Sequence, residues 1–449
     1  MPHGTQTLDS ARKNCSPKPL IGDSITDFWV ETAYARDSLT CFRDSLKSIL
    51  DEDTSQKVLV HGHRGCGKST EINKFISTLD SHWLVVSLNA DDYLPTSGNE
   101  AADVLLAACT KLMEVAEKNE LPLNEKSMEG VWKFFDQTTT TRSGTREATG
   151  GVEAGVKVSE SFLGKLFGIK ADLVSALKFG SRTEESTVHQ IRRRKGELCA
   201  AVNALGNAAE TAWREKSKDP KARILLVIEA LDKLGLADAR QIFVHDGRIL
   251  SEVAIRAIYT IPVFTFHSAD AGAIRSHFEH DLALPMIKVF GPDGKPCKEG
   301  RKILTAIVRK RVIPAVLPDD ALALLIERTG GVLRDIFDAI QTAAQFNTVR
   351  KTGIIDAVSI GLALDRMVNI IGLQIAYPPE EKKAPRPLQE KLAAIAKAQA
   401  AGKTTSAQPD PDIQLLLMSG ALLEYNGQGW LGVHPLARQY LRSLDLDVG

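Results

Sequence analysis

The chain has 449 residues, with 56 basic and 56 acidic side chains, so its formal net charge is zero. Hydrophobic residues make up 43% and charged residues 25% of it, which is typical of a globular chain of roughly two to four domains and excludes a disordered or fibrous protein. The zero balance also excludes attraction of the whole chain to nucleic acid or to an anionic membrane.

The chain lacks the sequence features of secreted and membrane proteins. Residues 1–15 contain no apolar signal core, and no apolar run approaches the roughly 20 residues of a membrane span. The six cysteines have no C-x-x-C spacing, which argues against disulfides and structural zinc. His277 and His280 form a close pair without a third ligand nearby, and we interpret them as surface residues. We expect a cytoplasmic protein with no membrane contact.

The first elements lead up to a glycine-rich motif. Residues 1–27 are polar and are interpreted as a loose lead-in. Helical spacing over 36–50 is followed by a β-branched run at 58–60, which is typical of a buried parallel strand. The motif occupies 62–69, and apolar residues at helical spacing continue over 70–79. The sequence therefore predicts strand, loop and helix in the order that a phosphate-binding loop needs.

Residues 62–69 read GHRGCGKS and match the G-x-x-x-x-G-K-[ST] pattern that binds a nucleoside triphosphate. The glycines let backbone N–H groups turn toward an anion at a helix N-terminus, where the helix dipole favours negative charge. We expect Lys68 to contact the β- and γ-phosphates and the Ser69 hydroxyl to ligate Mg²⁺. The residues predicted to bind ATP here are Gly62, His63, Arg64, Gly65, Cys66, Gly67, Lys68, Ser69 and Thr70.

A second strand is predicted at 83–88 and a helix at 100–117, which complete a βαβ unit. The stretch 127–186 interrupts this pattern. Its composition predicts a threonine- and glycine-rich hairpin at 138–160, and an apolar segment with helical spacing follows at 164–179. That segment either packs on the insert itself or is exposed for an interaction.

The most hydrophobic run of the chain, 224–228, is predicted to be the central strand of a parallel sheet. Glu229 follows it at the sheet edge where ligands bind in such folds, and we expect it to hold Mg²⁺. The next position is Ala230, so the usual catalytic carboxylate is missing. Asp232 is the nearest substitute, and the alternative that it only caps the following helix stays open.

The C-terminal half is predicted to be mostly helical. A strand over 261–266 ends at His267 and Ser268, and three helices follow at 303–311, 319–328 and 333–346. Linkers flank an alanine-rich helix at 388–401. The last segment reads as a helix, two short strands around the turn Asn426-Gly427, and a closing helix, which together suggest a winged-helix module.

These motifs resemble the AAA+ ATPases, in the branch shared by origin-recognition-type initiators and the signal-transducing STAND ATPases. The resemblance implies an α/β fold: a P-loop NTPase parallel sheet with a helical lid and a C-terminal winged-helix module. The implied domains are a lead-in at 1–27, an ATPase core at 28–290 with an insert at about 127–186, a lid at 291–375, a linker and helix at 376–411, and the winged-helix-like module at 412–449.

The resemblance also implies residue roles. Arg334 follows a Gly-Gly turn and matches the lid arginine that contacts the nucleotide in the family. Ser268 or His267 matches, loosely, the polar residue that senses the γ-phosphate. The implied catalytic residues are Lys68, Glu229, Asp232 and Arg334, and the candidates for an arginine finger donated by a neighbouring subunit are Arg248, Arg256 and Arg275.

The sequence thus predicts an ATP-binding switch that hydrolyses ATP slowly, because Ala230 cannot position water, and that forms a homo-oligomer or engages a protein partner. Anti-phage defence is implied only at the level of the resemblance. The alternative is a DNA-binding initiator or transposition-type regulator. The segment 424–430 contains no Arg or Lys, which favours a protein partner over DNA. A GTPase is disfavoured because no N-K-x-D segment follows Glu229.

Overall fold

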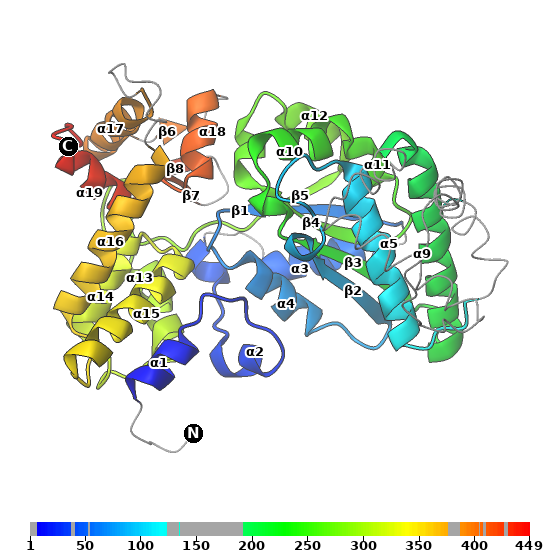
Figure 1. The fold of residues 1–449 in the computed structure, drawn as a ribbon, viewed down its shortest axis with the longest axis horizontal. Coiled ribbons are helices and arrows are strands. Elements are labelled where there is room, and N and C mark those ends of the chain that lie inside the picture. Colours follow the sequence, from blue (N-terminus) through cyan, green and yellow to red (C-terminus); the bar gives the residue numbers. More distant parts are fainter. Residues whose placement is uncertain are drawn as a thin grey trace, which may run out of the picture.

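The computed structural model describes residues 7–36, 41–52, 54–123, 134, 192–375, 387–403, 405–406, 410–425 and 430–449. A part built on a sheet lies beside a helical part, and the C-terminal elements lie above the latter in Figure 1. The predicted hairpin at 138–160, the helix-like segment at 164–179 and the Asn426-Gly427 turn lie outside the described residues.

The sheet has five parallel strands in the order β2-β3-β4-β1-β5. Because all the strands are parallel, Gly62, Asn89 and Glu229 end their strands at the same edge. The middle strand is β4 and not the one carrying 224–228, so the predicted central position of that run is wrong; it lies one place away, still covered on both faces. The strands are β1 Lys57–Gly62, β2 Trp83–Asn89, β3 Arg223–Glu229, β4 Arg256–Pro262 and β5 His280–Ala283.

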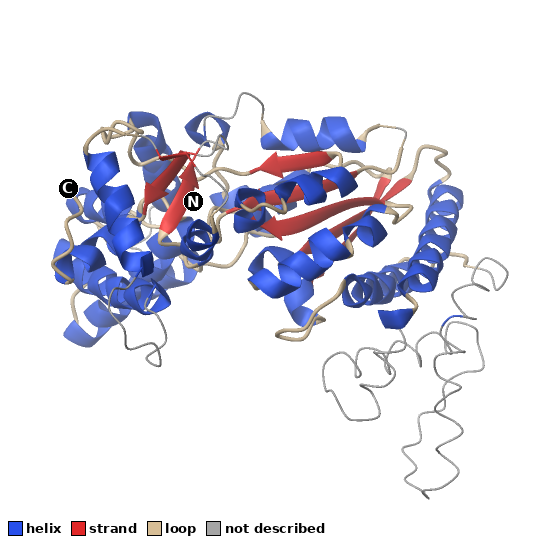
Figure 2. Ribbon diagram, turned by 90° about the horizontal axis from the view of Figure 1, so that it is seen from above, coloured by secondary structure: helices blue, strands red, loops and turns tan. Residues whose placement is uncertain are grey.

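Helices cover both faces of the sheet (Figure 2). Along β3, Ile224, Leu226 and Ile228 face one layer, whereas Leu225 and Val227 face the other. This alternation with apolar residues on both sides explains the uninterrupted hydrophobic run. One layer is α3 Phe42–Leu50 and α4 Lys68–Ile76; the other contains α5 Ala101–Lys118, α9 Lys195–Ser217, a π-helical turn Gln241–His245 that follows α10 Leu236–Arg240, α11 Gly247–Ser251 and α12 Ala271–His277.

The strand predicted at 261–266 lies earlier in the chain. β4 ends at Pro262, and a 3₁₀ turn, Val263–His267, follows it. Proline cannot donate a ladder hydrogen bond, and the Thr265 hydroxyl donates to the Pro262 carbonyl over 2.6 Å to close the turn. The buried apolar residues of the turn continue the pattern of the strand, which is why sequence placed the strand too late. Ser268 is therefore removed from the strand end.

In the described residues the helical part contains α13 Lys298–Arg309, α14 Asp319–Thr329, α15 Leu333–Arg350 and α16 Ala357–Ile375. Sequence predicted the first three and missed α16. This helix has 19 residues and a mean hydropathy of 1.4, enough by length and composition alone to cross a membrane. The expectation that no such run exists was therefore wrong. Ala363, Leu364 and Val368 are buried in the core that α16 forms with its neighbours, as in any core helix.

The N-terminal segment is structured from residue 7 and is not a loose lead-in. It forms α1 Leu8–Asn14, α2 Asp23–Phe28 and a 3₁₀ turn Ala33–Arg36. The Asn14 amide donates to the Arg311 carbonyl over 3.2 Å, and the Gln341 amide donates to the Arg12 carbonyl over 3.2 Å. The segment is thereby held against α13 and α15.

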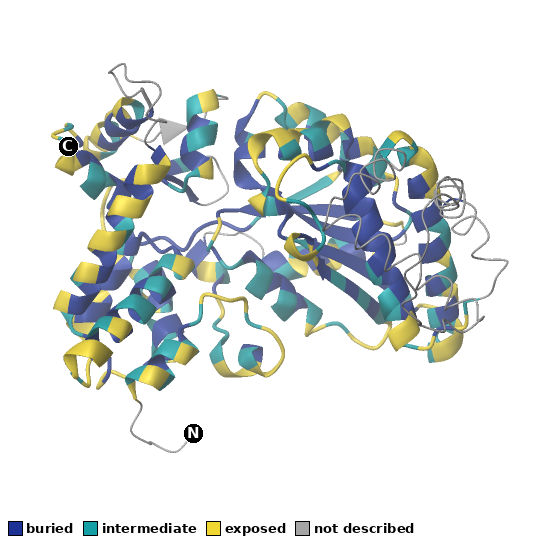
Figure 3. Ribbon diagram, in the orientation of Figure 1, coloured by how far each residue is buried: buried dark blue, intermediate teal, exposed yellow. Residues whose placement is uncertain are grey.

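The C-terminal elements follow the predicted order of helix, two strands and helix. Leu422 pairs with Val433 in the antiparallel hairpin. Their apolar side chains share one core with the lid helices, and in Figure 3 buried residues run from α16 into this region. The elements are α17 Pro387–Ala400, β6 Thr405–Ser406, α18 Pro411–Met418, β7 Leu422–Tyr425, β8 Trp430–Val433 and α19 Pro435–Ser443.

Candidate functional site

The motif at 62–69 joins β1 to the N-terminus of α4. Gly67 caps α4 with φ of 102° and no side-chain cap, so the first N–H groups of the helix remain available to an anion. Gly65 has φ of 83°, and a Cβ there would lie 2.8 Å from the Cβ of Arg334. Both positions require glycine, the second because the lid packs directly on the loop.

Lys68 is buried, and its ammonium group contacts three oxygen atoms of the chain. Its Nζ lies 2.8 Å from Oδ2 of Asp232 and donates to the carbonyls of Gly62 (2.6 Å) and His63 (2.9 Å). Burial disfavours the charge on Lys68, but the Asp232 carboxylate outweighs it and raises the pKa of the amine. For Asp232, burial is likewise outweighed by Lys68, and its pKa is lowered. A charged pair is therefore held at the centre of the loop.

The backbone after β3 explains how Asp232 reaches Lys68. Ala230 is left-handed, with φ of 68°, and begins a 3₁₀ turn, Leu231–Lys233. The turn brings Asp232 back under the loop, whereas an extended residue 230 would continue away from the strand. The N-cap of the next helix, α10, is Gly235. The geometry thus favours the substitute carboxylate over the capping alternative.

Ser69 and Glu229 lie together at the sheet edge. Burial raises the pKa of the Glu229 carboxyl, and a hydrogen bond with the Ser69 side chain opposes this rise. A hydroxyl and a carboxylate oxygen side by side are the hard ligands that Mg²⁺ prefers. Asn89 pairs with Glu229 across the strands and lines the same cleft, a position that the sequence did not suggest. The Ser69 and Glu229 side chains fit a divalent cation.

A cleft of about 760 Å³ opens above these residues, within the size range of small-molecule sites. The loop and β3 form its floor, and α15 of the lid forms one wall. The N-terminal segment, through residues 17–21 and 28–30, forms another wall. The Leu20 amide donates to the Thr70 hydroxyl over 3.2 Å and fixes this wall to α4. Sequence reasoning missed the segment, although Phe28 and Trp29 stand out as adjacent aromatic residues.

Arg36 is a second residue that sequence reasoning missed. It is buried, and its guanidinium donates to the Cys66 carbonyl over 2.8 Å, to the Thr32 hydroxyl over 3.0 Å and to the Pro285 carbonyl. Burial lowers its pKa. The contact fixes one carbonyl of the loop, and Arg36 itself lines the cleft. No spacing rule indicates it, because the two partners meet only in the tertiary structure.

Of the remaining predicted residues, Arg334 lines the cleft and Ser268 does not. Arg334 begins α15 and lines the cleft, and in the part of the chain that the structure describes its guanidinium has no hydrogen bond or ion pair. Ser268 lines neither large cavity; its hydroxyl donates to the Thr265 carbonyl over 2.7 Å and accepts from the Asp270 amide, so its proposed contact with phosphate is not supported.

The three candidates for an arginine finger differ in burial: one is buried and two are exposed. Arg256 is buried at the start of β4 and donates to the carbonyls of Leu50 and Glu52, which excludes it as a group offered to another subunit. Arg248 on α11 and Arg275 on α12 are exposed. They remain candidates.

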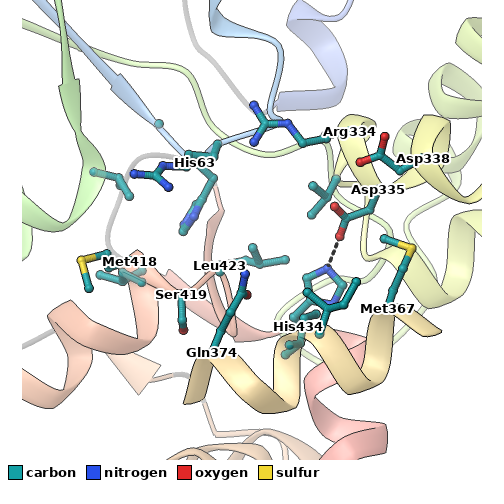
Figure 4. Close-up of a pocket in the computed structure, with 18 of the residues that line it drawn as sticks. His63, Arg334, Asp335, Asp338, Met367, Gln374, Met418, Ser419, Leu423 and His434 are labelled. Atoms are coloured by element: carbon teal, nitrogen blue, oxygen red, sulfur yellow. Dashed lines mark hydrogen bonds and ion pairs between the residues drawn. The ribbon is translucent and has the colours of Figure 1, made fainter. Parts of the chain in front are cut away.

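A second cavity, of about 470 Å³, lies where the loop, the lid and the C-terminal elements meet. Figure 4 shows His63 and Arg334 on one side of it and Leu423 and His434 on the other. Asp232 and Arg334 line both cavities. The fold is that of a P-loop NTPase. In its sheet, β4 lies between the loop strand β1 and the acidic strand β3.

No model of a protein family matches the chain, and no curated protein matches it. Among solved structures, a Walker-type ATPase of Pyrococcus abyssi aligns with 96% of this chain and 99% of its own at 10% identity, with a TM-score of 0.45. The Aeropyrum pernix ORC2 protein covers 97% and 96% at 11% identity and TM-score 0.42. The Thermotoga maritima RuvB Holliday junction branch migration motor covers 95% and 98% at 14% and 0.36. Likenesses at these TM-scores do not assign a function.

Proposed function

We propose that this protein binds ATP with Mg²⁺ in the cleft above residues 62–69 and hydrolyses it slowly. The observation that carries the proposal is the grouping of two pairs, Lys68 with Asp232 and Ser69 with Glu229, at the free N-terminus of α4. The helix end and Lys68 bind phosphate oxygens. Mg²⁺, held through Ser69 and Glu229, neutralises charge on the phosphates when bound.

The Lys68–Asp232 pair supports slow turnover. Asp232 is the carboxylate placed to orient an attacking water, but its pKa is lowered by the ion pair, and a weakly basic carboxylate is a poor proton acceptor. A triphosphate also has to replace Asp232 as the partner of Lys68 before the carboxylate becomes free. Both effects raise the barrier to hydrolysis.

The lid provides the second state of a switch. Arg334 reaches toward the cleft from α15 and has no partner of its own among the described residues, so a phosphate that accepts its hydrogen bonds stabilises the lid against the sheet. We propose that this closed form assembles with further copies or engages a protein partner. The role in anti-phage defence that the resemblance implies is not part of this proposal, because it is not tied to any residue of the site.

The DNA-binding alternative is less favoured. Glu424 and Tyr425 of the C-terminal hairpin are buried against the loop and the lid, and the described hairpin residues include no cation. Phosphate contacts need exposed Lys or Arg. Salt-sensitive binding of duplex DNA by the full-length protein would reverse this preference.

Calorimetry with ATP and Mg²⁺ tests the proposal. Lys68→Ala is expected to weaken ATP binding by about 10- to 100-fold, since charged hydrogen bonds contribute about 1.5–3 kcal/mol each. Lys118→Ala, at the exposed end of α5, is the matched control and should bind ATP like the parent. Equal ATP affinity of Lys68→Ala and the parent would show that the loop is not a nucleotide site.

A further inference from the structure

Among the described residues, a buried hydrogen bond joins the C-terminal hairpin to the phosphate-binding loop, beside the apolar packing of Leu423 and Tyr425 in one cluster with Cys66. The Glu424 amide, on β7, donates to Nε2 of His63 over 2.7 Å. Both residues are buried, and they are 361 positions apart in the sequence. The second position of the loop motif accepts any residue, so this contact belongs to this chain and not to the motif.

The imidazole of His63 is suited to accept this bond. Burial lowers its pKa to about 3, with Glu424 opposing that shift, so the ring is neutral and Nε2 carries a lone pair. A buried N–H left without an acceptor is destabilising, because it has lost its hydrogen bond to water. The hydrogen bond therefore fixes β7 to the loop.

The same C-terminal elements are also fixed to the lid. The Tyr425 hydroxyl donates to the Gly330 carbonyl over 3.0 Å, in the turn that precedes α15. His434 Nε2 lies 3.1 Å from Oδ2 of Asp335, the contact that is dashed in Figure 4. A Cβ on Gly330 would lie 2.7 Å from Cδ of Pro435, so the two parts fit closely. The hairpin thus spans the loop on one side and the lid on the other.

Lys68 connects this hairpin to a triphosphate bound in the cleft. It donates to the backbone carbonyl of His63, the residue whose side chain holds β7. A triphosphate in the cleft competes for the same ammonium group. When Lys68 turns toward phosphate, the carbonyls of Gly62 and His63 lose their donor, and the backbone that positions the imidazole is released.

We propose that His63 is a positioning residue that latches the C-terminal hairpin to the phosphate-binding loop, and that ATP releases the latch by withdrawing Lys68 from the His63 carbonyl. This inference rests on the proposed function. The hairpin holds the lid and the loop in the arrangement described above, and release of β7 leaves the lid free to close through Arg334. The latch lowers the apparent affinity for ATP, because binding has to disrupt it.

Hydrogen exchange of full-length protein, read at the Glu424 amide with and without a non-hydrolysable ATP analogue and Mg²⁺, tests the latch. We expect this amide to be protected in the free protein and to exchange at least about tenfold faster with the analogue bound. His63→Phe keeps a ring but removes the acceptor; it should expose the amide without nucleotide and bind ATP about tenfold more tightly. His63→Gln retains an acceptor oxygen and should restore protection.

Tyr425→Phe removes the hydrogen bond from β7 to the Gly330 carbonyl of the lid. It tests the latch without a substitution in the phosphate-binding loop, so its result does not depend on correct folding of the loop variants. It should also tighten ATP binding, whereas Tyr259→Phe, which loses a comparable buried bond from β4 to the Leu250 carbonyl of α11, should not. ATP binding with unchanged exchange at Glu424, or equal ATP affinity of His63→Phe, Tyr425→Phe and the parent, would overturn the latch and leave the proposed function intact. Absence of ATP binding by the parent would overturn both.

Discussion

The backbone angle of Ala230 determines that the Asp232 carboxylate reaches the phosphate-binding loop. The acid that usually follows the strand is replaced by Ala230, but the left-handed conformation of Ala230 carries the chain back so that Asp232 contacts Lys68. The pair is buried, and removing one partner of such a pair usually costs about 3–5 kcal/mol. The residue is therefore placed to affect both stability and hydrolysis.

We predict that Asp232→Asn lowers phosphate release by at least about 100-fold, because an amide cannot accept a proton from water. The affinity for ATP should not fall, since the phosphates of bound ATP replace the Asp232 carboxylate as the negatively charged partner of Lys68. Phosphate-release assays and calorimetry on the same preparation check both statements. Ala230→Glu is the companion variant. Its carboxylate would leave a left-handed backbone in another direction, so it should not restore turnover; substantial turnover in an Ala230→Glu/Asp232→Asn double variant would contradict this assignment.

His63 makes stability depend on pH. Its pKa in the folded protein is about 3, lowered by burial from 6.5, and Glu424, Lys68, His267 and His434 face it. Between these values the unfolded chain binds a proton that the folded chain does not, so stability falls as the pH decreases. From about pH 7 to about pH 5, the melting temperature of the parent should drop more than that of His63→Gln. Parallel curves for the two proteins would show that His63 does not stay neutral.

At the scale of elements, the lid and the C-terminal hairpin behave as one unit. Lid helices α14 to α16 share a core with α18, α19 and the hairpin residues Leu422, Leu431 and Val433, whereas Leu423 and Tyr425 pack in a core with the sheet. Removal of the C-terminal residues would expose that core, so the function of the hairpin has to be studied with point variants in the full chain. One face of the long apolar helix α16 belongs to the same core, whereas Val358, Leu362 and Leu373 are exposed.

Arg334 should couple nucleotide binding to lid closure. For Arg334→Ala we expect ATP affinity to fall modestly, by about 10-fold, because one charged hydrogen-bonding group is lost. The protection that ATP gives to α14 and α15 in hydrogen exchange should disappear in this variant. Arg328→Ala, which removes contacts with Asp365 and Gln439 outside both cavities, is the control and should keep that protection. Retained protection in Arg334→Ala would assign closure to another group.

At the scale of the whole molecule, we predict that ATP with Mg²⁺ increases the mass of the particle in solution and that Lys68→Ala abolishes the increase. Light scattering measures this directly. Of the exposed finger candidates, Arg248→Ala or Arg275→Ala should slow hydrolysis in the assembled protein without weakening ATP binding, as expected for a group that acts on a neighbouring copy. An unchanged mass with bound ATP would favour a monomeric switch with a different partner.

The sequence by itself determined the parts that depend on local rules. The loop motif, β1, β2, β3, the first three lid helices and the C-terminal hairpin follow from glycine placement, apolar runs and helical spacing, all of which act over a few residues. Local patterns failed at Pro262, where a strand changes into a buried 3₁₀ turn without any change in hydrophobicity. They also placed the wrong strand at the centre, since strand order is not encoded in any one strand.

Only the tertiary structure decided which distant groups meet. Arg36 on the loop carbonyl, the N-terminal wall of the cleft and the bond from Glu424 to His63 join positions far apart in the chain. Such contacts are set by the packing of whole elements, and each partner alone looks like an ordinary polar or apolar residue. The candidate phosphate site was therefore predictable from sequence, whereas the coupling of that site to the rest of the molecule was not.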